Sequence, residues 1–145
     1  MLTALFNFAM KVIQFVVEGE PVPKGRPRFS VKTGRAYTPA RTHDAERAVV
    51  QAYKKAYPDG EHFEAGIPLE LSCRFYFKLP KKPSKSQYEG GFTQKTPDLD
   101  NALKMISDAM NNIAYADDKQ ICVLRAEKRY SKYPHTEIII RDITE

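Results

Sequence analysis

The chain has 145 residues, of which 42% are hydrophobic and 28% are charged, enough apolar side chains for one globular domain with its own core. Lysine and arginine outnumber the acids by 23 to 18, so the formal net charge is +5 and a polyanionic partner is favoured. Cys73 and Cys122 have apolar, strand-like neighbours, which excludes a disulfide framework or a cysteine zinc site and predicts two core thiols in a reduced, intracellular protein. The three histidines have no metal-ligand spacing.

Residues 1–17 are mostly apolar, but we do not expect them to form an export signal. No basic residue precedes the apolar run and no small-residue cleavage site follows it. The run is also shorter than the roughly 20 residues that a membrane span needs. We expect a flexible extension over residues 1–10, with Met10 as a second candidate start, and then a strand over residues 12–18. One domain is expected to cover residues 1–145.

Residues 19–41 form a long segment rich in proline, glycine and basic residues, without apolar periodicity, which predicts a loop. No acid occurs between Pro21 and His43, while Phe29 and Tyr37 are interleaved among the cations. Such a loop suits DNA, because cations contact phosphates and aromatic rings stack on bases. A solvated basic loop fits equally well. The candidate DNA-binding residues are Lys24, Arg26, Arg28, Lys32 and Arg35.

A helix and a strand are predicted next. Thr42 is a candidate N-cap, and small apolar residues at helical spacing predict a helix over residues 42–57, which Pro58-Asp59-Gly60 ends. Residues 69–79 alternate apolar and polar side chains and are the clearest strand of the chain. A second basic loop follows this strand, and its candidate DNA-binding residues are Lys81, Lys82 and Lys85.

The last third of the chain predicts one helix and two strands. The helix carries apolar residues at i, i+4, i+7 and i+11, and should end near residue 111; these positions are Leu99, Leu103, Ile106 and Met110. Residues 123–130 and 137–142 predict strands that form a terminal β-hairpin around Tyr133-Pro134. The order is strand-helix-strand-helix-strand-strand, which predicts an α+β single domain with a mixed β-sheet and two main helices packed on it.

The distinctive feature of this helix is the group of acidic residues at its start and in the turn that follows it. Asp98 and Asp100 lie two residues apart, so an extended backbone puts both carboxylates on one side and a helical one turns them about 200° apart. A shared metal ion therefore requires the helix to begin within residues 98–100 and the Asp117-Asp118 turn to return to it. With Lys104 one turn further on, this set suits a magnesium-dependent phosphodiesterase. Taken singly, each residue also fits ordinary capping, ion pairing or turn chemistry.

Three segments in this region have a familiar order and spacing, namely Pro97-Asp98-Leu99-Asp100-Asn101 with Lys104, Asp108-Ala109-Met110-Asn111, and Tyr115-Ala116-Asp117-Asp118-Lys119-Gln120-Ile121. This pattern resembles the RusA-like family of Holliday junction resolvases, which phages and prophages often carry. The earlier segments 23–28 and 37–39 also look like N-terminal elements of phage members. The motif match covers roughly the last third of the chain.

The resemblance implies a cytoplasmic bacterial protein, of phage or prophage origin, that acts as a homodimer in DNA recombination and repair. Its implied activity is that of a crossover junction endodeoxyribonuclease, which resolves four-way DNA junctions by paired symmetrical nicks with Mg²⁺ and without a membrane or a small-molecule cofactor. The resemblance also implies that Asp98, Asp100 and Asp118 hold the metal and, with Lys104, form the catalytic set. The family pattern favours Asp118 over Asp117, and Asp108 is expected to support Lys104.

Other acid-based sites fit less well. A phosphatase-type Asp-x-Asp nucleophile follows a buried apolar strand, whereas polar residues precede Asp98. A restriction-type nuclease needs an acid, an apolar residue and a lysine in that order on a strand. The nearest candidate, Glu127-Lys128-Arg129, lacks this order, so this type stays a distant alternative. A general metal-dependent nuclease, a non-catalytic DNA-binding protein and a non-catalytic interaction module remain open alternatives.

Overall fold

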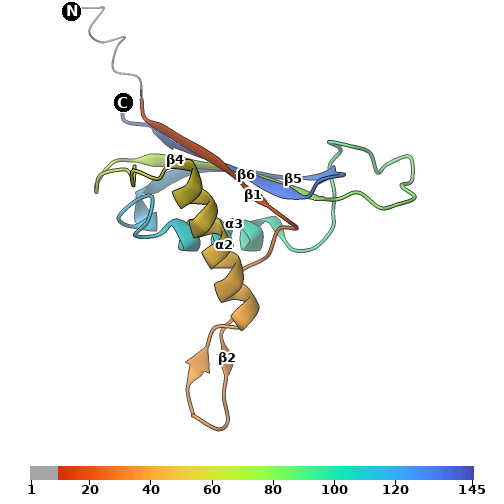
Figure 1. Ribbon diagram of the computed structural model, residues 1–145, viewed down its shortest axis with the longest axis horizontal. Coiled ribbons are helices and arrows are strands. Elements are labelled where there is room, and N and C mark those ends of the chain that lie inside the picture. The colour runs from red at the N-terminus through yellow and green to blue at the C-terminus, as the bar shows by residue number, and fades with distance from the viewer. Residues whose placement is uncertain (1–9) are drawn as a thin grey trace, which may run out of the picture.

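The computed structural model describes residues 10–145, so the predicted flexible extension lies outside the described residues except for Met10. Four strands form the main sheet in the order β1-β6-β4-β5 (Figure 1). Their bounds are Val12–Glu18 (β1), Leu69–Lys78 (β4), Ile121–Ser131 (β5) and His135–Asp142 (β6). β4 and β5 are parallel and the other pairs are antiparallel, which confirms the mixed sheet.

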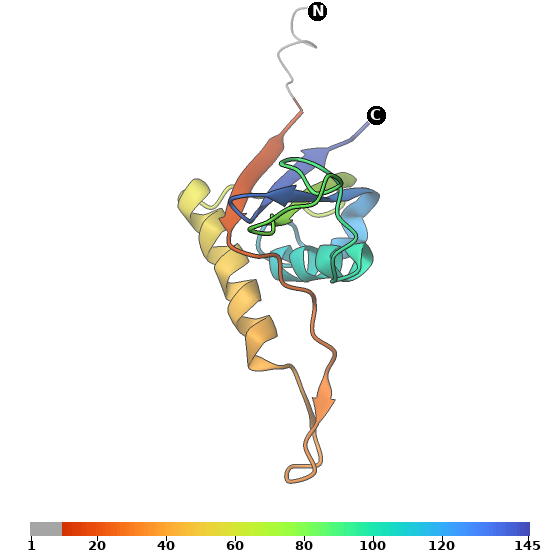
Figure 2. The ribbon, with the colours of Figure 1, turned by 90° about the vertical axis from the view of Figure 1, so that its right-hand side faces the viewer.

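Helices α2 (Ala40–Ala56) and α3 (Leu99–Met110) cover one face of this sheet (Figure 2). The apolar positions of β4 alternate with polar ones and are almost completely buried, so they form the floor of the core. The apolar face of α3 packs on this floor, as its periodicity predicted. Together these elements confirm the predicted α+β fold. Within residues 10–145, no helix has the length and apolar character needed to cross a membrane.

The predicted terminal hairpin is wrong, because β6 does not pair with β5. β6 instead lies between β1 and β4. Ser131 at the end of β5 pairs with Lys78, and His135 at the start of β6 pairs with Tyr76, so residues 132–134 cross the end of β4. Two strand spacings are about 10 Å and four peptide links reach about 13 Å, so this short connection suffices.

The start of α2 also differs from the prediction. The N-cap residue is Pro39, whose side chain makes no capping hydrogen bond, and Thr42 lies within the first helical turn. Thr42 is buried, and its Oγ1 accepts a hydrogen bond from the backbone N–H of Gly25, 3.0 Å away. The hydroxyl that resembled a helix cap therefore anchors the preceding loop instead.

The segment predicted as a loop contains a small projecting hairpin. Strands β2 (Arg28–Phe29) and β3 (Ala36–Tyr37) pair antiparallel and extend away from the body of the molecule (Figure 2). We call residues 26–37 the arm. Its strands are only two residues long and have no alternating burial, so the sequence carried no strand periodicity to detect.

The two cysteines are not alike. Cys73 on β4 is buried, as predicted. Cys122, near the start of β5, is exposed, so its prediction as a core thiol is wrong. β5 lies at the edge of the sheet, where its alternating positions are only partly covered.

Candidate active site

The first part of the site is the start of α3. The helix begins at Leu99, with Asp98 at the N-cap position in an extended conformation, so the predicted start within residues 98–100 is confirmed. The Asp98 side chain caps no backbone N–H. Among the described residues, neither the Asp98 nor the Asp100 carboxylate takes part in a hydrogen bond or an ion pair, and both side chains are exposed. Two free carboxylates therefore face solvent at this helix end.

Lys128 on β5 supports the segment that leads into α3. Its Nζ donates hydrogen bonds to the carbonyl oxygens of Lys95, at 2.9 Å, and Pro97, at 3.1 Å. These contacts tie the residues directly before Asp98 to the edge strand of the sheet. The position of Asp98 thus depends on a lysine thirty residues further along the chain.

The second part is the turn that returns to α3, residues 115–120, which we call the return turn. It ends in a short 3₁₀ helix, η1 (Asp118–Gln120). The buried side chain of Gln120 organises it: Oε1 accepts hydrogen bonds from the N–H groups of Ala116 and Asp117, at 3.0 and 3.1 Å. Nε2 donates to the carbonyl oxygens of Glu64 and Ile67, at 2.9 and 3.1 Å. One amide therefore satisfies four backbone groups on two segments.

The two adjacent aspartates of the return turn have different surroundings. Asp117 Oδ1 accepts a hydrogen bond from the N–H of Lys119 at 2.9 Å and, with Gln120, forms a capping box for η1. The hydrogen bond from the Lys119 N–H lowers the pKa of Asp117. Asp118 is held by its backbone, whose N–H donates to Asn111 Oδ1 at 3.1 Å. Asp117 is thus engaged in the turn, whereas the Asp118 carboxylate caps no backbone N–H group of residues 10–145.

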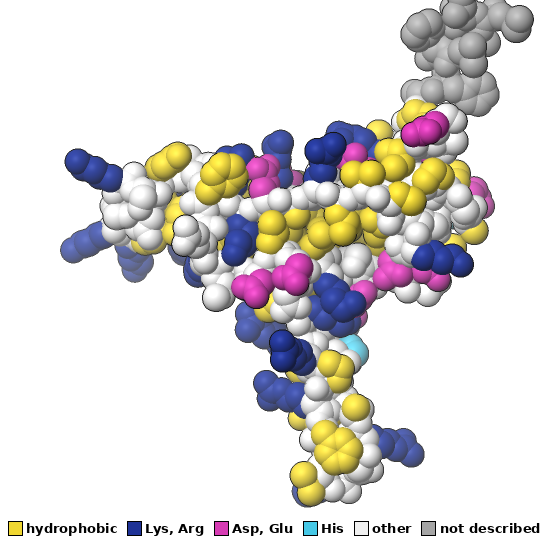
Figure 3. Space-filling model, turned by 180° about the vertical axis from the view of Figure 1, so that it is seen from behind, with side chains coloured by type: hydrophobic (Ala, Val, Ile, Leu, Met, Phe, Trp, Pro, Cys, Tyr) yellow, Lys and Arg dark blue, Asp and Glu magenta, His cyan; other side chains and the backbone are white. Residues whose placement is uncertain are grey.

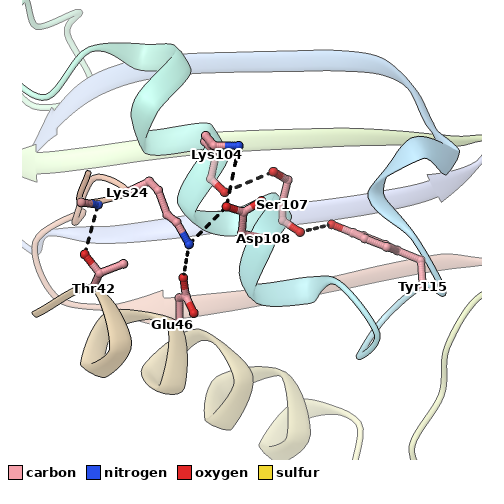
Figure 4. Close-up of polar contacts among 8 residues, drawn as sticks. Lys24, Thr42, Glu46, Lys104, Ser107, Asp108 and Tyr115 are labelled. Atoms are coloured by element: carbon pink, nitrogen blue, oxygen red, sulfur yellow. Dashed lines mark hydrogen bonds and ion pairs between the residues drawn. The ribbon is translucent and has the colours of Figure 1, made fainter. Parts of the chain in front are cut away.

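An ion-pair cluster lies between the helices (Figure 4). Lys24 Nζ contacts Glu46 Oε1 on α2 at 2.6 Å and Asp108 Oδ2 on α3 at 3.2 Å. Lys104 Nζ lies 3.8 Å from the same Asp108 oxygen. Burial lowers the pKa of Lys24, but its hydrogen bonds and ion pairs with the two acids outweigh this and raise it above the usual value. Asp108 contacts Lys104, as expected from their spacing.

Asp118 comes close to this cluster. Burial raises its pKa, the hydrogen bond and charge of Asp117 raise it further, the charge of Asp108 adds to this, and Lys104 opposes it. Beside the cluster, the buried Tyr115 hydroxyl donates to the Ser107 carbonyl oxygen at 2.6 Å (Figure 4). The return turn therefore reaches α3 beside Lys104 and Asp108.

Within residues 10–145, no three acid, histidine or cysteine side chains lie close enough together to enclose a metal ion.

The basic candidates occupy two separate places. Arg26 and Arg28, with Arg41, line a hollow of about 270 Å³ at the root of the arm, and Lys32 and Arg35 are exposed further along it. Lys81, Lys82 and Lys85 are exposed on the loop after β4, which leaves the body at another end (Figure 1). Lys24 differs from all of them, because its ammonium group is occupied by two acids.

Four residues that matter to this geometry were not among the candidates: Asn111, Gln120, Glu46 and Lys128. The spacing of Asp117 and Gln120 is that of a capping box, so the turn contacts of Gln120 were recognisable locally. Glu46 and Lys128 contact residues 22 to 33 positions away, and no local pattern marks such contacts.

Known proteins share this sequence pattern. The model of the family described as Endodeoxyribonuclease RusA matches residues 18–141. The chain belongs to the RusA family. An uncharacterized protein of Bacillus subtilis, YqaN, is 34% identical over 144 residues, which cover 93% of this chain and 99% of that protein. A protein of Lactococcus phage r1t named crossover junction endodeoxyribonuclease rusA is 34% identical over 84 residues, 57% of this chain and 61% of that protein.

The RusA match confirms the resemblance seen in the motifs and extends it well beyond them. It runs from the end of β1 almost to the end of β6, and so includes the arm, both helices and the return turn. The arm and the acidic end of α3 are therefore parts of one family domain.

Proposed function

We propose that this chain is a Mg²⁺-dependent, structure-selective endodeoxyribonuclease that resolves four-way DNA junctions by paired symmetrical nicks. The family is that of an endodeoxyribonuclease, and the phage relative carries the name of a crossover junction enzyme. The observation that supports a catalytic chain is the pair of carboxylates at the start of α3, beside a lysine, that have no partner in the part of the chain that the structure describes. A protein that used these acids only for capping would bind the backbone with them, and Asp98 does not.

The donor set suits a hard divalent cation. Carboxylate oxygens are preferred ligands of Mg²⁺, and within residues 10–145 the carboxylates of Asp98, Asp100 and Asp118 accept no backbone hydrogen bond that would compete with it. We assign these three residues to the metal. Among residues 10–145 these three carboxylates do not enclose a metal ion, because the return turn brings Asp118 beside Lys104 and Asp108 and not to the start of the helix. When bound, the cation polarises the scissile phosphate and lowers the pKa of a water ligand.

Lys104 is assigned to charge stabilisation. It lies one helical turn after Asp100, its side chain is mostly exposed, and Asp108 contacts its ammonium group. An ammonium group in this place stabilises negative charge that grows on the phosphoryl oxygens. Asp108 then acts through Lys104 and Lys24, and Asp117 acts through the return turn.

The DNA contacts are assigned to exposed cations. On the arm these are Arg26, Arg28, Lys32 and Arg35, and after β4 they are Lys81, Lys82 and Lys85. Lys24 is reassigned from a DNA contact to a positioning residue, because it bridges α2 and α3. Since each phosphate neutralised releases counterions, affinity should fall steeply with salt.

We also propose a homodimer that acts in recombination and repair in the bacterial cytoplasm, with a phage or prophage origin. Symmetrical nicks on two strands require two active sites related by a twofold axis, which one copy of this chain does not supply. The phage relative supports the proposed origin.

The deciding experiment is cleavage of a synthetic four-way junction with Mg²⁺. We expect paired nicks at symmetrical positions, no cutting in EDTA, and no cutting by Asp98→Asn or Asp118→Asn proteins that still bind the junction. Equal cutting of a linear duplex of the same sequence would indicate a general nuclease. Junction binding without cutting by the wild type in any divalent cation would indicate a non-catalytic DNA-binding protein and would overturn the proposal.

A further inference from the structure

The arm exposes apolar side chains that its own hairpin does not cover. The exposed fractions are 67% for Phe29, 93% for Val31 and 49% for Tyr37. The hairpin is held by short pairings, Arg28 with Tyr37 and Phe29 with Ala36, and by hydrogen bonds within the turn of residues 30–35. A two-stranded ribbon has no core in which to bury such groups. They are therefore available to a partner.

The charged residues around these apolar side chains indicate the chemistry of the partner. The arm carries only basic charged residues, and no acidic side chain lies on this projection (Figure 3). Arg28 lies directly across the ribbon from Tyr37, so a guanidinium group and an aromatic ring share one face. Cations beside exposed aromatic rings match phosphates beside base faces. In paired duplex these base faces are stacked, and apolar side chains reach them only where stacking is broken.

The root of the arm is tied to the helices that carry the acids. The N–H of Gly25 donates to Thr42 on α2, and a Cβ at Gly25 would clash with that hydroxyl. The N–H of Lys24 donates to the Asn101 carbonyl oxygen in the first turn of α3 at 3.2 Å. The Lys24 side chain then bridges α2 and α3. The fold therefore sets where the arm leaves the body relative to the start of α3.

We propose that the tip of the arm recognises unstacked bases at the exchange point of a four-way junction. Phe29 and Val31 pack on those bases, Tyr37 adds an aromatic contact on the opposite face of the ribbon, and the neighbouring Arg28, Lys32 and Arg35 hold the adjoining phosphates. This assignment rests on the proposed function and specifies how a junction, where stacking is interrupted, is distinguished from a plain duplex. The fixed root places the strand that leaves the exchange point near Asp98 and Asp100.

The tip variant carries two substitutions, Phe29→Ser and Val31→Ser, and is compared with the protein that has the unchanged arm. Both proteins also carry Asp118→Asn, so that cleavage does not interfere. The probe is a four-way junction with 2-aminopurine next to the exchange point, and a linear duplex of the same sequence. Binding of the protein with the unchanged arm should raise the 2-aminopurine fluorescence of the junction several-fold. Binding of the tip variant should leave this fluorescence unchanged. The tip variant should lose roughly 10-fold in junction affinity. Its duplex affinity and salt slope should not change, because no charge is altered.

The matched control is Tyr133→Ser in the link between β5 and β6, which removes another exposed aromatic side chain and should change neither quantity. The proposal is overturned if the tip variant keeps both the fluorescence rise and the junction preference, or if it loses junction and duplex affinity equally. It is also overturned if sedimentation shows that the tip substitutions dissociate a dimer, because the apolar groups would then cover a second copy. Failure of the proposed function would appear separately, as no Mg²⁺-dependent cutting by the wild type.

Discussion

The two ends of α3 are built in opposite ways. At its start, Asp98 and Asp100 are exposed and have no side-chain partner among the described residues. At its end, the return turn packs against the helix, and the side chains of Gln120 and Asn111 hold the backbone that carries Asp118. The residue at which the helix begins determines where Asp98 and Asp100 lie. Hydrogen bonds between distant segments determine where Asp118 lies.

This difference separates two kinds of constraint on an acidic residue. Carboxylates without partners add little to folding and are available to a ligand, whereas buried amide groups that satisfy backbone atoms are costly to remove. Lys104 lies between the two ends and contacts Asp108. Substitutions at the start of α3 should therefore affect activity alone, and substitutions in the return turn should affect stability as well.

The largest effect is expected at the start of α3. Asp98→Asn should lower the rate of junction cleavage by about 10³-fold or more, because the proposed metal site would lose a ligand, and should leave the free energy of unfolding within about 0.5 kcal/mol of the wild type. Single-turnover cleavage and urea unfolding measure the two quantities. Asp59→Asn, an exposed acid in the turn after α2, is the matched control for loss of charge. A large loss of stability in Asp98→Asn would show that this carboxylate is structural.

The next effect is expected in the return turn. Gln120→Ala leaves the N–H groups of residues 116 and 117 and the carbonyl oxygens of residues 64 and 67 without their partner, and should lower stability by about 1–3 kcal/mol. Cleavage should fall too, because the backbone of Asp118 loses its support. Gln51→Ala on the exposed side of α2 should change neither. Unchanged thermal unfolding of Gln120→Ala would contradict the role of this amide.

The adjacent aspartates allow a crossed comparison. Asp117→Ala removes the capping acceptor and should lower stability by about 1 kcal/mol while cleavage stays within about tenfold of the wild type. Asp118→Asn should do the reverse, abolishing cleavage with little change in unfolding. Thermal unfolding and junction cleavage of the two variants, measured side by side, show which aspartate supports the fold and which supports cleavage. The opposite pattern would assign the metal-binding role to Asp117.

A smaller effect is expected at the Lys24 bridge. The double-mutant cycle of Lys24→Met and Glu46→Gln should show a coupling of about 1 kcal/mol in urea unfolding, because the pair is partly buried and well aligned. The exposed pair Asp44 and Arg47, at 3.8 Å, should show a coupling close to zero. Equal coupling in both pairs would indicate that the bridge is no more than a surface ion pair.

The smallest effect is expected for a single cation of the arm. Lys32→Gln should weaken junction and duplex binding to a similar extent and reduce the slope of log affinity against log salt by about 1, because one of the proposed phosphate contacts would be lost. Lys54→Gln on the last turn of α2, away from the arm, should leave the slope unchanged. Filter binding over a range of salt concentrations measures both. An unchanged slope for Lys32→Gln would exclude it as a phosphate contact.

Local patterns were enough to predict most elements and part of the site. Period-two alternation identified β4, apolar spacing identified α3, and the need for two carboxylates on one side required the helix to begin within residues 98–100, as it does. The motifs around these acids predicted the family, which the match over residues 18–141 confirms. These features depend on neighbours a few residues apart, so a single sequence reports them directly.

The tertiary structure decided what local patterns do not encode. Alternation shows that a strand has one buried face, but not which strand it pairs with, so β6 lies between β1 and β4 and not beside β5. Charge alone does not show whether a lysine is free, and Lys24 is bound by acids from two helices. The buried partners of Gln120 lie 53 and 56 residues away. Such contacts arise from packing between distant segments, so the return turn acquires its geometry only when the chain has folded.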